Sequence, residues 1–250
     1  MTAGHAMPSR ISQPTARAAS LFTFSAWGGK YAPFDKDAAF GAALAAREGL
    51  PMFKSQLLAE GGGVKVEGEG TIITTDTCFL NPNRNPTWSR EEVTRELLET
   101  LGGEKVIWLP GNADETETDG HVDGIAVFVA PAVVLIEGAD DPSDPWRHIK
   151  QANIDALRGQ TDAKGREIRM VTIPEAEESC IIGEKFCRSY VNCYFVNGGV
   201  IMPEYGTPND AVARDIFQSL FPTSRIRGVH IPNICVGGGG IHCITQQEPA

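Results

Sequence analysis

The sequence predicts a protein of the α/β class in which one β-β-α-β unit is repeated. Three observations predict this fold class. Four segments share the same outline, and their starts lie roughly sixty residues apart. Each complete segment opens with two β-forming runs around a glycine-rich or Asn-Gly turn, as in a β-hairpin. Each hairpin is followed by a stretch of helical periodicity and then by another β-forming run.

The hairpins come first in each unit. The four segments begin at Glu60, Gly120, Tyr190 and Gly237. The first three have turn residues at 67–70, near Pro131 and at 197–199. We expect the two runs on either side of each turn to pair as antiparallel strands.

The helix of the first complete unit has the clearest signals. Ser89 is a favourable N-cap, and Glu92 stands three residues later, as in a capping box. Apolar residues then recur with helical spacing up to Leu101. The matching helices of the next two units are expected at 144–157 and 210–220. The strands after the three helices are expected at 105–109, 167–173 and 227–231.

The two ends of the chain have only parts of a unit. Residues 20–52 resemble the tail of a unit, with a strand over 21–24 and a helix over 37–47. The segment that begins at Gly237 has no helix of its own. Three units are therefore expected to be complete.

Length and composition indicate a single domain over residues 20–250. Residues 1–19 are rich in small and hydroxyl side chains and contain no acidic residue, so we expect a disordered leader there. The formal charge of −10 argues against nucleic acid as a partner and is compatible with a cationic substrate. No apolar run is long enough to span a membrane. The six cysteines form no Cys-x-x-Cys pair. The sequence shows no secretory signal, so we expect free cysteines in a reducing, cytoplasmic compartment.

Reactive or polar residues occupy equivalent positions at the starts of the four segments. These residues are Glu60, His121 with Asp123, Asn192 and Cys243. Repeated units arranged in a ring would place such positions near one axis. We therefore expect these side chains to form a single site.

Cys243 follows four glycines, and its thiolate would be the nucleophile of a hydrolase that also uses His121 and Asp123. His121 can transfer protons at neutral pH, and Asp123 lies two residues away, on the same face of an expected strand. His242 would then point to the opposite face. Two alternatives stay open: a buried structural cysteine and a metal site at His121 and Asp123.

The remaining two positions suit substrate binding. A carboxylate beside glycines at the start of a buried strand needs a cation or several donors, so we expect Glu60 to bind a cationic substrate. Asn192 is expected to bind the substrate as well.

Several longer motifs resemble those of the agmatine deiminases, which belong with bacterial peptidylarginine deiminases to the guanidine-modifying pentein superfamily. They are Trp-Gly-Gly at 27–29, Glu-Gly-Gly at 60–62, Asn-Arg-Asn-Pro at 83–86, Trp-Leu-Pro-Gly at 108–111, Asp-Glu-Thr-Glu-Thr-Asp-Gly-His-Val-Asp at 114–123, Val-Asn-Gly-Gly-Val-Ile-Met-Pro at 196–203 and Gly-Gly-Gly-Ile-His-Cys-Ile-Thr-Gln-Gln at 238–247. The resemblance covers about residues 24–249.

The resemblance implies an α/β propeller of β-β-α-β units around a pseudo-fivefold axis. It implies that Glu60 and Asp123 accept hydrogen bonds from the guanidinium of agmatine, and that Cys243 attacks its central carbon. His121 would protonate the departing ammonia and then activate water, which gives N-carbamoylputrescine on the route to putrescine. No metal or organic cofactor is implied, and the habit of the family indicates a homo-oligomer.

One departure from the family pattern leaves alternatives open. The family has an N-terminal unit with a Trp-x-Arg-Asp-x-Gly-Pro motif whose Asp also binds the guanidinium, and this chain lacks that motif. The propeller is therefore expected to be incomplete at its N-terminus. The alternatives are a deiminase for peptidyl or free arginine and a non-catalytic remnant that binds guanidines.

Overall fold

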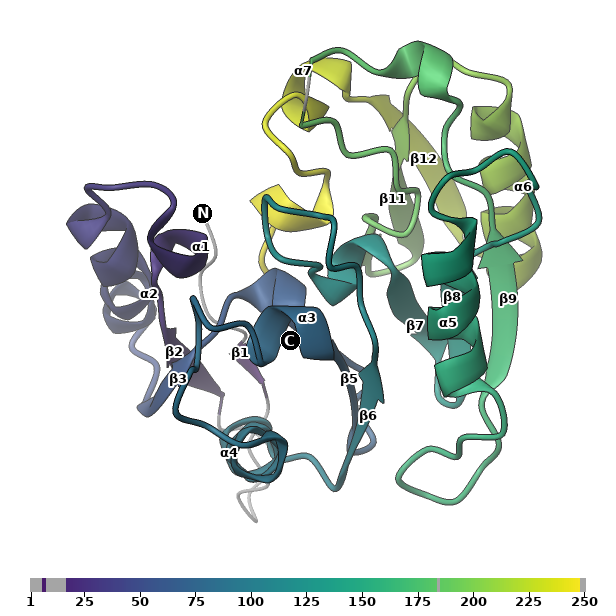
Figure 1. Cartoon of the computed structure of the whole chain (residues 1–250). Coiled ribbons are helices and arrows are strands. Elements are labelled where there is room, and N and C mark those ends of the chain that lie inside the picture. The colour runs from purple at the N-terminus through teal and green to yellow at the C-terminus, as the bar shows by residue number, and fades with distance from the viewer. Residues whose placement is uncertain (1–5, 8–16, 184, 248–250) are drawn as a thin grey trace.

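The computed structural model describes residues 6–7, 17–183 and 185–247, which form four three-stranded sheets (Figure 1). In each sheet the first two strands pair antiparallel as a hairpin. A helix follows, and the last strand pairs parallel with the second strand of the hairpin. The predicted β-β-α-β unit is therefore confirmed.

The first unit contains β1 (Ala6–Met7), β2 (Ala18–Thr23), α1 (Ala26–Gly29), α2 (Asp35–Arg47) and β3 (Met52–Leu58). The second contains β4 (Lys65–Val66), β5 (Thr71–Thr75), α3 (Asp76–Phe79), α4 (Arg90–Leu101) and β6 (Lys105–Leu109). The third contains β7 (Ala126–Ala130), β8 (Val133–Glu137), α5 (Arg147–Leu157) and β9 (Arg169–Ile173). The fourth contains β10 (Tyr194–Val196), β11 (Gly199–Glu204), α6 (Asn209–Leu220), β12 (Arg225–His230) and α7 (Pro232–Cys235).

The expectation of three complete units is wrong, because the first unit also has its hairpin. Its β1 pairs with β2 through Ala6 opposite Ala19 and Met7 opposite Ala18. A strand of two residues is too short for alternation of polar and apolar residues to reveal it. The predicted leader over residues 1–19 lies for the most part outside the described residues.

Helix α4 shows how local signals fix an element. The Ser89 hydroxyl accepts a hydrogen bond from the backbone N–H of Glu92 at 3.2 Å. In return, the Glu92 carboxylate accepts one from the backbone N–H of Ser89 at 2.7 Å. Both bonds satisfy amides that have no partner within the helix. Gly102 ends the helix in the left-handed region, at φ 66°. The buried face of the helix comprises Val93, Leu97 and Leu101.

Neighbouring units share apolar cores. One buried cluster joins Val127 of β7 and Leu135 of β8 to Val200 of β11 and Phe217 of α6. Burying a side chain of this size contributes about 1.5–3 kcal/mol. The contact between two units is therefore part of the hydrophobic core, and it holds their loops in fixed positions.

Short 3₁₀ turns stand at the starts of three segments. They are η1 (Gly61–Gly63), η2 (Val122–Gly124) and η4 (His242–Ile244), and η1 lies against both of the others. Glu60, His121 and Cys243 are in or next to these turns. The expectation that these residues lie on strands is wrong, because β4 and β7 begin only after η1 and η2.

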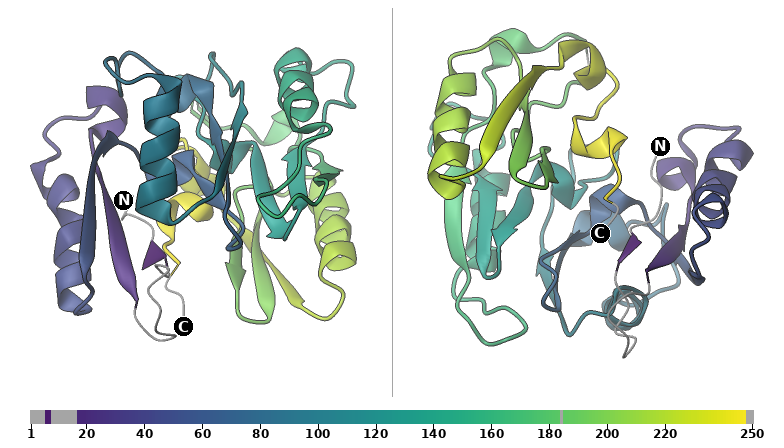
Figure 2. Two further views of the ribbon diagram at one scale, coloured as in Figure 1. Left: turned by 90° about the horizontal axis from the view of Figure 1, so that it is seen from below. Right: turned by 180° about the vertical axis from the view of Figure 1, so that it is seen from behind.

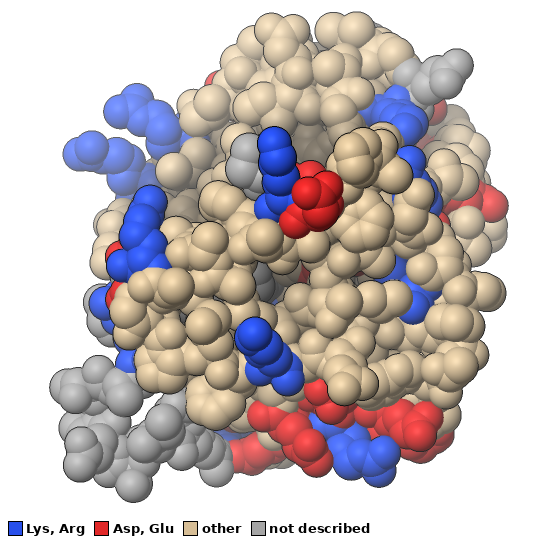
Figure 3. Space-filling model, turned by 90° about the vertical axis from the view of Figure 1, so that its left-hand side faces the viewer, with Lys and Arg blue, Asp and Glu red and all other residues tan. Residues whose placement is uncertain are grey.

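The four units follow one another around the C-terminal segment, which is yellow in Figures 1 and 2, and they do not form a closed ring. The side of the molecule that carries the first unit presents mostly uncharged residues, with acidic side chains gathered along one edge (Figure 3). Exposed apolar side chains of this unit include Phe40, Met52 and Phe53. Among the described residues, no helix is long and apolar enough to cross a membrane.

We predict that Leu97→Ala destabilises the fold, because the side chain is fully buried on the inner face of α4. Removing a buried leucine costs about 2–5 kcal/mol of unfolding free energy. Urea unfolding would measure the loss, with Glu99→Ala on the exposed face of the same helix as the control. A loss as small for Leu97→Ala as for the control would contradict the packing described.

Candidate active site

Glycines allow the turns to approach one another closely. A Cβ at Gly62 would lie 2.4 Å from His121 Nδ1 and 2.8 Å from Asp123 Oδ2, so no larger residue fits without displacing them. A Cβ at Gly240 would lie 2.6 Å from Asn192 Oδ1. Glycine is therefore required where one backbone meets the functional side chains of another segment.

Cys243, Asp123 and Asn192 lie together, although they come from different units. The Cys243 sulfur lies 3.5 Å from Asp123 Oδ2, and Asn192 Nδ2 lies 3.3 Å from the sulfur. Oδ1 of the same Asn192 side chain accepts a hydrogen bond from the backbone N–H of His242 at 2.9 Å. Asn192 therefore fixes the backbone next to Cys243 as well as contacting the sulfur.

His242 faces the site, and the expectation that it points to the opposite face is wrong. Its Nδ1 lies 2.8 Å from Asp123 Oδ2. Because residues 242–244 form a 3₁₀ turn, successive side chains are about 120° apart rather than on opposite faces. Burial and the charge of Lys65 lower the pKa of His242, despite Asp123. The neutral ring can donate from Nδ1 to the carboxylate, which only accepts.

Asp123 is ionised at neutral pH. Burial alone would raise its pKa, but the His242 hydrogen bond and the positive charges of Lys65 and His121 hold that pKa well below its usual range. The residue is 3% exposed. A buried negative charge beside a sulfur atom is suited to binding a cation that is also the target of the sulfur.

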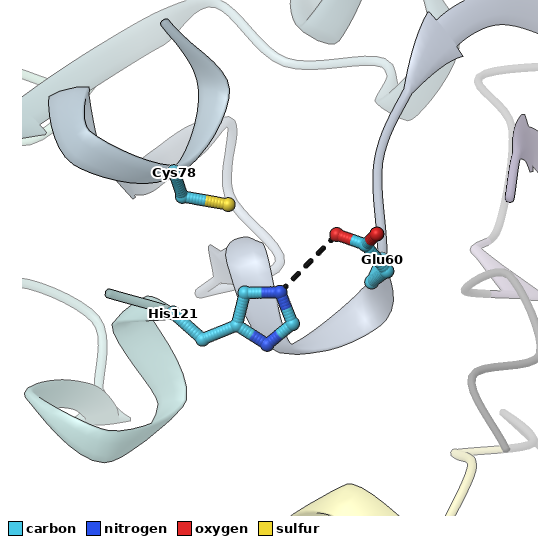
Figure 4. A group of neighbouring side chains, drawn as sticks. All are labelled: Glu60, Cys78 and His121. Carbon is cyan, nitrogen blue, oxygen red and sulfur yellow. Dashed lines mark hydrogen bonds and ion pairs between the residues drawn. The ribbon is translucent and has the colours of Figure 1, made fainter. Parts of the chain in front are cut away.

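His121 lies between Glu60 and Cys78 (Figure 4). Its Nε2 lies 3.2 Å from Glu60 Oε2, and the Cys78 side chain points toward the same imidazole ring. Burial alone would lower the pKa of His121, but the contacts with the Cys78 sulfur and the Glu60 carboxylate raise it well above the ordinary value. His121 is therefore an imidazolium at neutral pH and can act as an acid.

Arg84 belongs to the same network, and sequence reasoning did not single it out as a site residue. Its Nε lies 3.1 and 3.2 Å from the two Glu60 oxygens. Its other nitrogens donate to Asp119 Oδ2 at 2.8 Å and to the Thr118 carbonyl at 3.2 Å. The only signal was its place in the Asn-Arg-Asn-Pro motif, which does not identify the carboxylate that it binds. The contacts of Glu60 are thus with Arg84 and His121.

The Cys243 thiol holds its proton in the free protein. Burial, and then the negative charge of Asp123, raises its pKa to about 12. A thiol is a weak nucleophile, and the thiolate is the reactive form. The site therefore needs an additional positive charge near the sulfur before Cys243 can attack.

Two cavities meet at His121, Asp123 and Cys243. One has a volume of about 330 Å³ and continues toward Glu137 and Lys150. The other has a volume of about 570 Å³ and is lined by residues that include Trp27, Tyr31 and Gln246. Both volumes fit a small organic ligand. The reactive groups therefore lie where a small molecule can reach them.

Glu60, Cys78 and His121 also have the chemistry of a metal site. One ligand atom from each lies within 4.8 Å of the others, and all three residues are buried. Carboxylate, thiolate and imidazole are the ligands that Zn²⁺ prefers. A cation held there would occupy the His121 nitrogen that faces Glu60 and would displace its proton.

Comparison with known proteins gives one consistent family. The sequence profile of the family described as Porphyromonas-type peptidyl-arginine deiminase matches residues 6–249. A Streptomyces coelicolor protein, provisionally named an agmatine deiminase, is 41% identical, with 93% of this chain and 70% of that protein covered. A Latilactobacillus sakei protein with the same provisional name is 40% identical, with 92% and 69% covered.

The solved structure of the Enterococcus faecalis agmatine deiminase superposes with a TM-score of 0.88 at 34% identity. The match covers 94% of this chain and 70% of that one. The chain spans 65% to 70% of the length of the curated relatives it matches.

We predict that Cys243 reacts slowly with neutral iodoacetamide at pH 7, because its pKa is about 12. The rate should rise about tenfold per pH unit between pH 7 and 9, as the thiolate fraction rises. Peptide mass spectrometry would identify the alkylated residue, and Cys243→Ala is the control. A fast reaction independent of pH would show that the thiolate already exists in the free protein.

We also predict that Glu60→Gln makes His121 lose its proton at lower pH, because a negative charge beside the imidazolium is removed. Side-chain ¹⁵N NMR of His121 would follow the titration. Glu99→Gln, on the exposed face of α4, should leave the midpoint unchanged. Equal midpoints in Glu60→Gln and the unchanged protein would exclude Glu60 as the group that holds the proton.

Proposed function

The chain belongs to the Porphyromonas-type peptidyl-arginine deiminase family, and on this premise we propose that it hydrolyses agmatine to N-carbamoylputrescine and ammonia. The observation that carries the proposal is the position of the Cys243 sulfur, 3.5 Å from the ionised Asp123 in a cavity that His121 also lines. A guanidinium bound by Asp123 would place its central carbon next to the sulfur. The solved Enterococcus faecalis structure, described as an agmatine deiminase catalysing its reaction, and the provisional names of the curated relatives support the same reaction.

The substrate itself activates the nucleophile in this proposal. The guanidinium donates two hydrogen bonds to Asp123, since a planar fork of donors matches a carboxylate. Its positive charge offsets the charge of Asp123, which raises the pKa of Cys243 in the free protein. The thiol then releases its proton to solvent, and the thiolate forms beside the carbon that it attacks. Direct binding of the guanidinium by Glu60 and by Asn192 stays a prediction.

The first half of the reaction breaks a carbon–nitrogen bond. The Cys243 thiolate forms a carbon–sulfur bond with the central carbon, and the imidazolium of His121 donates its proton to one amino group. That group leaves as ammonia with the electron pair of the broken bond. The alkyl amidine remains attached to the sulfur as a thiouronium.

The second half restores the protein. The neutral His121 takes a proton from a water molecule, and the oxygen attacks the thiouronium carbon. The carbon–sulfur bond then breaks and its electron pair returns to Cys243. The proton of the added hydroxyl passes to the sulfur, which restores the thiol, and the neutral ureido product leaves. Glu60 acts through His121 in both halves, because its carboxylate favours the protonated ring.

The finer description of the fold is part of the same proposal. We propose that the four units and the segment from Gly237 to Ile244 are arranged around a pseudo-fivefold axis. Two further predictions concern the whole protein: a homo-oligomeric assembly and a cytoplasmic location. The reaction as written uses no cofactor.

Two other functions are distinguishable from this one. A deiminase for peptidyl or free arginine would use the same residues, and the description of the family names that activity. A protein that binds guanidines without turnover would release no ammonia. Comparison of agmatine, arginine and an arginine-containing peptide as substrates separates the first alternative, and ammonia release separates the second.

We predict that incubation with agmatine releases ammonia, and that Cys243→Ala lowers the rate at least about a thousandfold, because the covalent step is lost. Intact-protein mass spectrometry of the unchanged protein with a haloacetamidine should show one adduct, located on Cys243. Glu99→Gln, at an exposed position on α4 that lines neither of the two cavities, is the control and should remain active. A folded protein that forms the adduct but releases no ammonia would support binding without turnover.

A further inference from the structure

Cys78 is a buried thiol to which the mechanism above assigns no step. It lies in α3, its thiol is free, and its side chain points toward the His121 imidazole (Figure 4). We propose that Glu60, Cys78 and His121 bind one Zn²⁺ ion, and that the bound ion inhibits the protein reversibly. Binding of the ion is independent of the proposed function. The inhibition rests on that function, because His121 is the acid of the proposed reaction.

The three ligand atoms already lie close to the spacing of a zinc site. His121 Nε2 lies 3.2 Å from Glu60 Oε2, and one ligand atom from each of the three residues lies within 4.8 Å of the others. Bonds of about 2.0–2.3 Å at tetrahedral angles place two zinc ligands roughly 3.3–3.8 Å apart, so a shift of about 1 Å in the Cys78 side chain would complete the site. Among the described residues, no other three such side chains lie this close together.

The fold sets the spacing of the ligands, because they come from three separate segments. The end of β5 leads directly into α3 and is hydrogen-bonded to both of the other segments. Thr74 Oγ1 donates to the Gly63 carbonyl of η1 at 2.8 Å, and Thr75 Oγ1 donates to the Gly120 carbonyl, just before His121, at 2.6 Å. A Cβ at Gly63 would lie 3.4 Å from the Cys78 sulfur, so η1 packs directly against this thiol. The backbone therefore holds all three ligands in place.

The charges of the ligands match a divalent ion. A carboxylate and a thiolate supply two negative charges, and imidazole supplies a neutral nitrogen, which are the forms that bind a metal. Arg84 is the cation beside Glu60, and it is also paired with Asp119 at 2.8 Å. A carboxylate has about four acceptor positions, so Glu60 can keep Arg84 while Oε2 binds the ion. Thiolate and imidazole favour Zn²⁺ over Mg²⁺ and Ca²⁺.

A bound ion would block the acid of the reaction. His121 lines both cavities, so an ion can reach it from either one. The ion would take the place of the proton on Nε2, the nitrogen that faces Glu60. An imidazolium carries a proton on each nitrogen, whereas a ring that binds a metal through one nitrogen keeps a single proton and is neutral. Ammonia could then no longer leave with a proton from His121.

The binding test uses Co²⁺, which takes the same ligands as Zn²⁺ and absorbs in the near ultraviolet when a thiolate binds it. One equivalent of Co²⁺ per chain, added after treatment with a chelator, should produce this band in the unchanged protein and in Cys243→Ala. Cys78→Ser should lose the band and bind Zn²⁺ at least about tenfold more weakly. Cys180→Ser is the matched control and should keep both properties, because its thiol lies in η3 (Glu178–Cys180) and lines neither cavity.

The band also separates this site from an ion held by the nucleophile. A band that persists in Cys78→Ser, or that is absent in Cys243→Ala, would overturn the proposal. Diffraction from crystals of the unchanged protein soaked with Zn²⁺ needs no substitution, so it decides the question even where Cys78→Ser does not fold. Anomalous scattering at the zinc absorption edge should show one ion between the three side chains. Its absence from that position would equally overturn the proposal.

The inhibition is tested on ammonia release from agmatine. Zn²⁺ should stop the release, and a chelator should restore it. In Cys78→Ser, the Zn²⁺ concentration that halves the rate of the variant itself should rise at least about tenfold, since one of three ligands is lost. Equal sensitivity to Zn²⁺ in this variant and in the unchanged protein would contradict inhibition through this site. The Co²⁺ band and the diffraction experiment stand even where the unchanged protein releases no ammonia, so failure of the proposed function remains distinguishable.

Discussion

The buried ion pair between Arg84 and Glu60 is the interaction on which the site depends. Arg84 donates from Nε to Glu60, and its other nitrogens donate to Asp119 and Thr118, just before His121. Glu60 in turn contacts His121. One guanidinium therefore connects the residue before η1 to the loop that leads into η2. Removing one partner of such a pair leaves a buried charge, at a cost of about 3–5 kcal/mol.

The charges of the site explain why the Cys243 thiol is a weak nucleophile in the absence of a ligand. Asp123 is ionised and His121 is an imidazolium, whereas Cys243 keeps its proton because burial and Asp123 both disfavour the thiolate. The group that is absent from this set is a cation between Asp123 and the sulfur. A guanidinium supplies that cation, so in our proposal the nucleophile forms only when its target is present. A neutral molecule of similar shape would not form it.

The repeat explains how the side chains of the candidate site come from distant parts of the chain. Asp123 and His242 are 119 residues apart in sequence, yet their side chains lie 2.8 Å apart. Short 3₁₀ turns, η1, η2 and η4, begin three of the segments, and the shared apolar cores fix one unit against the next. Glycines at Gly62 and Gly240 then let each turn touch the side chains of another.

The sequence by itself determined the repeated unit and most of its elements. The capping residues Ser89 and Glu92 fix the start of α4, and the strand predicted over 105–109 is β6. These signals are local, because caps, turns and apolar periodicity act within a few residues. The repeat also indicated which residues share one site, since equivalent positions meet when the units pack together. Only the tertiary structure decided the partners: Arg84 for Glu60, His242 for Asp123, and β1 for β2. These contacts join residues that are distant in the chain, and their geometry depends on packing between units, which no local pattern encodes.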